Sequence, residues 1–383
     1  MLDRTKIGQE LSRVSLRLFQ EHTSLSWFTV RLWQSITTNE QFLQQVLRAQ
    51  LTHKLPRWQG SLDAITSHQP LRQPYAVVAA DGSQIYPDHH LQGIDCFLVN
   101  TGVALFSYDT VSKATLTSDP VLYTSGDTLT RYGQPFVTPE LVDLIREDHE
   151  FAALVRHGQQ LSVAGKAAIA LFDGNLLFWH LENKFQQVKE TFTTCYMQHL
   201  EALYQQRMVY AGYLSSSRFT DLVALMKQGL CDGEVACGLD GRALYSLCTA
   251  LETLTDAHLL QHILQPGQRT TVFASAAAMV DDYPEHSRPH FFYLNTGAEI
   301  VRIEIPAWVA ADVAALELVC GVSLDQCDKG QGYPVSLAEA HAQAVVSTSD
   351  RDFFYQLVFL QGVKQSQRVQ FSQKSLKKKI LNV

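Results

Sequence analysis

Two aspartates, each followed by a glycine, carry the strongest chemical signal in this sequence. Asp81 follows the short apolar run 75–80, and Asp173 follows the apolar run 167–172. Each run is typical of a buried strand, and Asp-Gly is typical of the turn at which such a strand stops. Functional side chains gather at the carboxyl ends of strands in α/β sheets. If the two strands are neighbours, both carboxylates lie in one crevice.

Two carboxylates in one crevice favour a bound cation, because their charges repel each other unless a positive ion lies between them. Hard oxygen ligands suit Mg²⁺ or Mn²⁺. Two such ions, roughly 3.5–4 Å apart, would clamp the attacking water and the leaving oxygen of a phosphodiester. The alternative is that each Asp-Gly pair is only a turn, since these two residue types dominate turns.

A third ligand is expected from the predicted helix 139–155. Glu147 and Glu150 are three residues apart, so they share one side of that helix. Either carboxylate could lean over the sheet towards the aspartates. The alternative is a solvated charged face on which Arg146 pairs with Glu150.

His341 is a further candidate ligand, in a predicted helix at 335–347. It lies on a stripe with Leu337, Ala340 and Ala344, which predicts that it faces inward. As a ligand it would bind through a neutral ring nitrogen while a second partner fixes its tautomer. The alternative is a hydrogen-bonded core histidine.

Two other places could bind the phosphates of a nucleic acid. Ser216 and Arg218 precede a predicted helix at 217–230, where hydroxyls, backbone N–H groups and a guanidinium can hold a phosphate. Ordinary helix capping is the alternative. Lys377 and Lys378 belong to a basic tail that can contact a DNA backbone, or can be a solvated end.

The elements that must position these residues alternate between strands and helices. Residues 1–70 are predicted to be helical, and a hairpin turning at 100–102 is expected after the first strand, with Pro120 marking an edge strand. The remaining predicted elements are strand 167–173, helix 182–206, strand 207–215 and a hairpin at 291–306 that turns at 295–297. This order predicts an α/β fold, a mixed sheet flanked by helices with an N-terminal helical extension. The expected divisions are 1–70, 71–365 and a basic tail at 366–383.

Composition narrows the class of protein. The chain has 383 residues, of which 46% are hydrophobic and 18% charged, so it can bury a large core. A net charge of −7 argues against a protein that coats nucleic acid non-specifically. Seven cysteines without a CxxC pair favour reduced thiols and the cytoplasm. No apolar signal core, membrane-length apolar run or GxxxxGK[ST] motif is present, which predicts no membrane span and no P-loop ATPase.

The motifs, taken in order, resemble the NurA nuclease family. The likeness rests on AADGSQI, R-x-x-x-E followed by AAL, ALFDGNL, VYAGYLSSSR, IVRIEIP and YPVSLAEAHAQAVVS. These segments lie between about residue 75 and residue 360. No single segment is distinctive, so the order and spacing of all six carry the resemblance.

The resemblance implies an RNase H-like core, dependence on Mn²⁺ or Mg²⁺, and cleavage of DNA during end resection and repair. It also implies a homodimer and a hexameric HerA-type ATPase as partner. By likeness, Asp81 and Asp173 are the two catalytic aspartates, Glu150 the helical glutamate, with Glu147 as its alternative, and His341 the late histidine ligand.

Two other functions fit parts of the pattern. The first is a catalytically weak protein of the same fold that serves as partner to a DNA motor. The presence of both aspartates and a candidate glutamate argues against this alternative. The second is a hydrolase of small phosphate esters, but an aspartyl-phosphate enzyme normally has a DxD motif, and here Ala79 and Ala80 precede Asp81.

Overall fold

The computed structural model describes residues 2–18, 23–49, 55–87, 91–92, 96–163, 167–231, 251, 253–365 and 370–371. Lys377 and Lys378, predicted to contact DNA, lie outside the described residues. Within the described parts, no helix is long and apolar enough to cross a membrane.

The described chain forms one large sheet, a small two-stranded sheet and helices around them. The strands are β1 (Arg57–Trp58), β2 (Thr66–Ser67), β3 (Tyr75–Ile85), β4 (Leu91–Gln92), β5 (Cys96–Tyr108), β6 (Lys113–Thr124), β7 (Ala167–Asp173), β8 (Val209–Leu214), β9 (Gln268–Arg269), β10 (Phe273–Ala274), β11 (Pro289–Asn295), β12 (Ile300–Pro306) and β13 (Gln370–Phe371). The helices are α1 (Arg4–Leu18), α2 (Thr23–Thr37), α3 (Glu40–Ala49), α4 (Ser125–Tyr132), α5 (Pro139–Val163), α6 (Gln186–Gln205), α7 (Asp221–Cys231), α9 (Asp256–Leu260), α10 (Ala307–Ala311), α11 (Val313–Lys329), α12 (Val335–Ala344) and α13 (Thr348–Lys364).

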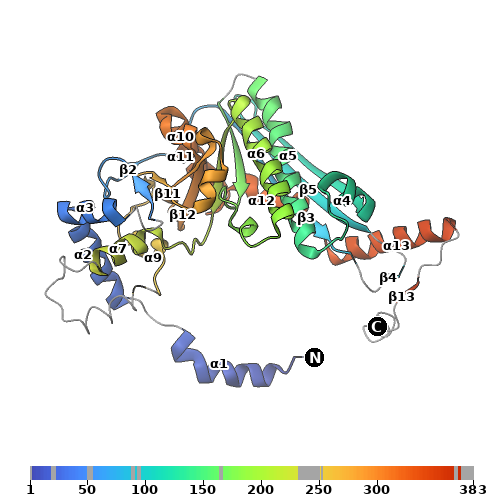
Figure 1. The fold of residues 1–383 in the computed structure, drawn as a ribbon, viewed down its shortest axis with the longest axis horizontal. Helices are drawn as coiled ribbons and strands as arrows, with labels where there is room; N and C mark the ends of the chain where they lie inside the picture. Colours follow the sequence, from blue (N-terminus) through green and yellow to red (C-terminus); the bar gives the residue numbers. More distant parts are fainter. Residues whose placement is uncertain are drawn as a thin grey trace.

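The large sheet is mixed, as the element order predicts. Its main path runs β1-β10-β11-β12-β8-β7-β3-β5-β6. The pairs β3–β7 and β7–β8 are parallel, and β12–β8, β3–β5 and β5–β6 are antiparallel. Helices α5 and α6 pack together on one face of the large sheet, and α11 and α12 cover the opposite face (Figure 1). The prediction of a mixed sheet flanked by helices is therefore confirmed.

Strand β3 separates two apolar cores by simple alternation. Val78 and Ala80 belong to the core beneath α5 and α6, whereas Val77 and Ala79 belong to the core beneath α11 and α12. Successive side chains in a strand point to opposite faces. The next residue, Asp81, therefore faces α12, and the position after it faces α5.

The hairpin predicted to turn at 100–102 does not exist. Strand β5 continues through these residues, and it pairs with β3 on one side and β6 on the other. Gly102 is needed there because α12 approaches the backbone of β5 closely, and not because of a turn. A Cβ at this position would lie 2.3 Å from Ala340 O and from Ala344 N of α12. The missing side chain lets α12 rest directly on the sheet.

Several other sequence predictions are confirmed. Strand β6, with Pro120, is the edge of the sheet, and β11 and β12 form the predicted hairpin, with Gly297 at a φ of +92° in its turn. Helix α5 begins at Pro139 as expected but extends to Val163. The prediction that residues 1–70 are helical is wrong for the end of this range: α1, α2 and α3 lie there, but β1 and β2 follow them and pair with β10 and β9 of the large sheet. The division of the chain at about residue 70 stays a prediction.

Candidate metal centre

The candidate site lies where β3 continues beyond the end of β7. The parallel pairing of these strands ends at Ala80 and Phe172, after which β7 stops at Asp173 and β3 runs on to Ile85. Asp173 is thus at a strand end, as predicted. Asp81 is not, because it remains paired with Gly102 of β5. The reading of Asp81 as a strand terminus is wrong, but the predicted proximity holds: the two aspartates follow paired residues on adjacent strands.

Both aspartates face α12 and interact with residues around that helix. His341 Nδ1 lies 2.6 Å from Asp81 Oδ2, and Tyr333 hydrogen-bonds to Asp173. Burial raises the pKa of Asp173, the Tyr333 hydrogen bond opposes that rise, and the negative charge of Asp81 adds to it. The carboxylates are therefore close enough to repel each other. Sequence reasoning missed Tyr333 as a site residue. The available signal was its place in the same motif as His341, eight residues earlier.

His341 is not buried, contrary to the prediction. Its side chain is 69% exposed, although its ring contacts Asp81. The apolar stripe that suggested burial is itself buried, and His341 lies at the margin of that stripe. The helix beneath it is held at its carboxyl end, where Asn100 Nδ2 (2.8 Å) and Ser83 Oγ both donate to Ala344 O. These two sheet residues position the histidine.

Glu150 approaches from the opposite face of β3. Its side chain is buried on α5 and forms an ion pair with Arg146. The absence of a side chain at Gly82 makes room for it, because a Cβ there would lie 2.5 Å from Glu150 Oε1. Burial raises the pKa of Glu150 to about 8; Arg146 opposes the rise, and the charges of Asp81 and Glu147 increase it.

Glu147, the alternative helical ligand, is engaged elsewhere. Its Oε2 lies 2.8 Å from His180 Nε2, in the short 3₁₀ helix Trp179–Leu181. Of the two candidate glutamates of α5, Glu150 is the one that lies against Gly82 of β3. The predicted Arg146–Glu150 pair exists, but it is not on a solvated face.

The chemistry of these donors fits a divalent cation. No three His, Cys, Asp or Glu side chains in the described ranges converge into a ready-made metal site. However, Arg146 lies near four acids. Burial lowers the pKa of Arg146, but the negative charges of the four acids raise it overall; they are Glu150, Glu147, Asp81 and Asp143. Carboxylate oxygens with one imidazole form a ligand set that suits Mg²⁺ or Mn²⁺. A bound cation would remove the repulsion between the acids.

The loop after Asp173 is fixed by a residue that sequence reasoning overlooked. Glu304 of β12 is buried, and its Oε2 accepts hydrogen bonds from Leu176 N at 2.8 Å and Leu177 N at 3.3 Å. Arg302 Nε donates to its other oxygen at 2.9 Å. The available signal was two charged residues inside the otherwise apolar segment IVRIEIP.

Ser216 and Arg218, the proposed phosphate contacts, follow the end of β8, whose Tyr213 pairs with Asp173. Part of this segment is already hydrogen-bonded. Ser216 N donates to Glu299 Oε2 at 2.8 Å, and Ser215 Oγ donates to Glu299 Oε1 at 2.6 Å. Helix α7 begins only at Asp221, so Arg218 does not lie at a helix terminus. Arg218 is exposed in an open depression beside these serines. Its role in DNA binding stays a prediction.

A scan against family models matches the NurA domain over residues 75–346. The chain belongs to the NurA family. Its fold is also similar to the crystal structure of the NurA nuclease from Sulfolobus solfataricus, with a TM-score of 0.51 and 12% identity, over 95% of this chain and 98% of that chain. A search of curated proteins finds no match. The NurA domain includes all the candidate ligands.

Proposed function

We propose that this NurA-family chain is a divalent-metal-dependent nuclease that hydrolyses phosphodiester bonds in DNA. The observation that carries the proposal is the contact of His341 Nδ1 with Asp81 Oδ2 at 2.6 Å, beside Asp173 on the adjacent strand and with Glu150 buried across β3. Family membership and the fold shared with a NurA nuclease support the same activity. Mn²⁺ or Mg²⁺ is the proposed cofactor, because the donors are mainly carboxylates.

Each side chain has a distinct role in this proposal. Asp81, with Asp173 on the adjacent strand and Glu150 across β3, would provide the oxygen ligands, and His341 would provide a nitrogen ligand. When bound, divalent cations activate the attacking water and stabilise the leaving oxygen. Glu304 positions Asp173 by fixing the loop that follows it.

The hydrogen-bonding partners prepare the ligands for binding. Tyr333 orients the Asp173 carboxylate, and His341 orients that of Asp81. Glu150 must lose its proton before it can bind a cation, and burial has raised its pKa to about 8. Cation binding at neutral pH should therefore release protons.

Further features are proposed from the family likeness. These are an RNase H-like core, a homodimer, action in DNA end processing and repair, and cooperation with a HerA-type ATPase that would supply ATP-driven movement. The proposed place of action is the cytoplasm, which the seven cysteines without a CxxC pair favour. Co-purification with a HerA-type hexamer and a mass measurement in solution test the partner and the dimer.

The activity is tested by incubating end-labelled single- and double-stranded DNA with the purified protein in Mn²⁺, Mg²⁺ or EDTA. We expect cleavage with metal and none with EDTA. Asp81→Ala and Asp173→Ala should each abolish cleavage while circular dichroism shows an intact fold. Normal cleavage by both variants would refute the site.

A further inference from the structure

A second polar cleft lies beside the candidate metal centre, between α5 and the outer strands β5 and β6. Its volume is about 520 Å³. We call it the α5 cleft, and its polar side chains come from two strands and two helices. They include Thr101, Thr117, Asp119, Arg131, His149 and Arg156.

One polar atom in the α5 cleft is buried without a partner. Thr101 is 3% exposed, and its Oγ1 has no hydrogen-bond partner among the described residues. A buried hydroxyl that makes no hydrogen bond is destabilising, because it has lost its contacts with water. A ligand oxygen in the cleft could accept a hydrogen bond from this hydroxyl and remove the destabilisation.

Two arginines at the cleft are available for an anion. Arg131 is 54% exposed, donates to Tyr123 OH at 3.1 Å and has the buried Asp148 Oδ2 3.7 Å away. Arg156 is 63% exposed, with Asp119 Oδ2 3.4 Å away, and such an exposed ion pair contributes little to stability. Arg156 can therefore exchange its partner for a phosphate, and the exposed part of Arg131 can approach the same phosphate, since guanidinium groups bind phosphate in a bidentate manner.

The two histidines of the cleft, His149 and His157, contribute little charge near neutral pH, because burial lowers the pKa of each. Burial lowers the pKa of His149, and the positive charge of Arg131 lowers it further. His149 Nε2 lies 2.5 Å from Tyr123 OH, which keeps the ring in place. The two arginines therefore outnumber the single lining carboxylate, that of Asp119.

The α5 cleft begins next to the candidate metal centre. Thr101 of β5 pairs with Gly82 of β3, against which Glu150 lies, and adjacent strands are about 4.8 Å apart. On α5, the lining residue Ala153 follows Glu150 by nearly one helical turn, a rise of about 5 Å. A DNA strand held at the acids can therefore reach the cleft with a neighbouring phosphate.

We propose that the α5 cleft binds a backbone phosphate of the DNA strand close to the bond that is cut. Thr101 Oγ1 donates to a phosphate oxygen, and Arg131 and Arg156 supply the positive charge. This inference rests on the proposed nuclease function for its substrate, but binding can be measured without cleavage.

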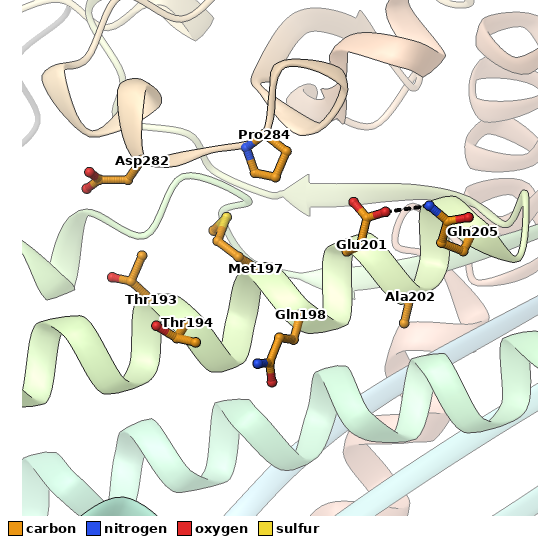
Figure 2. A pocket seen from close by; sticks show the side chains of 9 residues that line it. All are labelled: Thr193, Thr194, Met197, Gln198, Glu201, Ala202, Gln205, Asp282 and Pro284. Carbon is orange, nitrogen blue, oxygen red and sulfur yellow. Dashed lines mark hydrogen bonds between the residues drawn. The ribbon is translucent and has the colours of Figure 1, made fainter.

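A depression on the outer side of α6 provides an internal contrast (Figure 2). Its lining includes Glu201 and Asp282 and no arginine or lysine. It also contains Thr193, whose Oγ1 is likewise buried without a partner among the described residues. A buried hydroxyl without nearby cations is not expected to attract a phosphate, so Thr193→Val is a matched control for Thr101→Val.

The test measures fluorescence anisotropy of a labelled single-stranded oligonucleotide in EDTA, over a range of salt concentrations. The double variant R131Q/R156Q should bind at least tenfold more weakly and show a salt slope smaller by about 1.4, since each lost cation lowers the slope on a single strand by about 0.7. The control R351Q/K364Q removes the same charge from exposed positions of α13 and should stay within about twofold of the parent. Equal affinities of the two double variants would overturn the proposal.

The hydroxyl is tested separately. T101V should weaken binding by about threefold or more, without lowering the melting temperature, because it removes a hydroxyl that has no partner in the free protein. T193V should leave binding unchanged. Equal effects of T101V and T193V on affinity would contradict the role of Thr101.

Cleavage assays with Mn²⁺ separate this inference from the nuclease proposal. R131Q/R156Q should raise KM with a much smaller change in kcat, since its acids are intact. A parent protein that binds the oligonucleotide through the cleft but never cleaves DNA would refute the nuclease and not the cleft. Cleavage by the parent together with parent-like binding by R131Q/R156Q would refute the cleft alone.

Discussion

Two groups of buried charge lie on the same sheet, and their carboxylates have different kinds of partner. In the group around β12, Arg302 contacts Asp221 at 2.7 Å and Glu304 at 2.9 Å. Glu304 also accepts backbone N–H groups, and Asp256 accepts those of Leu222 and Val223 at 3.0 Å each. Fixed backbone donors therefore satisfy these acids.

Most partners of the carboxylates beside the end of β7 are side chains, although Gly82 N also donates to Asp81 Oδ1 at 2.8 Å. Asp81 contacts His341, Asp173 contacts Tyr333, and Glu150 contacts Arg146. Side chains can turn away when a cation arrives, whereas backbone donors cannot. We therefore propose that buried charge around β12 serves the fold, whereas buried charge near β7 serves a ligand.

The largest expected effect is on catalysis in the second group. Asp173→Asn keeps the size of the side chain but removes its charge, so cleavage should fall on the order of 10³-fold. The free energy of unfolding without metal should not fall, because repulsion with Asp81 is relieved. Gel assays and urea denaturation measure the two quantities, with Asp352→Asn on exposed α13 as control. A large loss of stability in D173N would show that the charge of Asp173 stabilises the fold, as the charges around β12 do, and would contradict the proposed difference between the two groups.

Arg302→Met should have the opposite profile. It leaves Glu304 buried without its guanidinium partner, which costs about 3–5 kcal/mol. Urea denaturation measures the loss, and Arg351→Met, at an exposed position, should change stability by less than about 0.5 kcal/mol. If R302M were as stable as the parent, the β12 group would not be a structural network.

Gly102→Ala should disturb the placement of His341. The new Cβ would meet the backbone of α12 at 2.3 Å, so the helix must shift, at a cost of about 1–3 kcal/mol, and cleavage should fall. Gly126→Ala is the matched control, since the nearest atom to a Cβ there is 3.6 Å away. Parent-like stability and cleavage in G102A would show that α12 does not depend on this close approach.

The smallest predicted effect concerns pH. The pKa of Glu150 is raised in the folded protein to about 8, so its contribution to stability is present below the unfolded pKa, about 4.5, and is lost as pH rises through 8. In EDTA, the parent should therefore lose more stability than Glu150→Gln between pH 4.5 and pH 8. Identical pH profiles of the two proteins in urea denaturation would contradict a raised pKa of the buried Glu150.

Local patterns were sufficient for many elements and insufficient where tertiary contacts decide. The start of α5 at Pro139 and the end of β7 at Asp173 follow from capping and turn chemistry. The segment at 100–102 has turn composition, but neighbouring strands on both sides and α12 above it keep it extended. Composition alone cannot distinguish a glycine needed for a turn from one needed for close packing.

The candidate site was predicted in the same uneven way. The proximity of Asp81 and Asp173 could be predicted from two similar strands. The exposure of His341 could not, because it depends on how α12 rests on β5. The partners Tyr333 and Glu304 come from distant segments, so no local pattern connects them with Asp173.

The central claim is that the acids beside the end of β7 bind a divalent cation. Isothermal titration of Mn²⁺ into the metal-free protein tests it most directly, with Asp173→Asn and Arg302→Lys as comparison variants. We predict binding to the parent with release of protons, loss of binding in D173N, and retained binding in folded R302K. A parent that binds no Mn²⁺ at millimolar concentrations, or a D173N variant that binds it as the parent does, would contradict the claim.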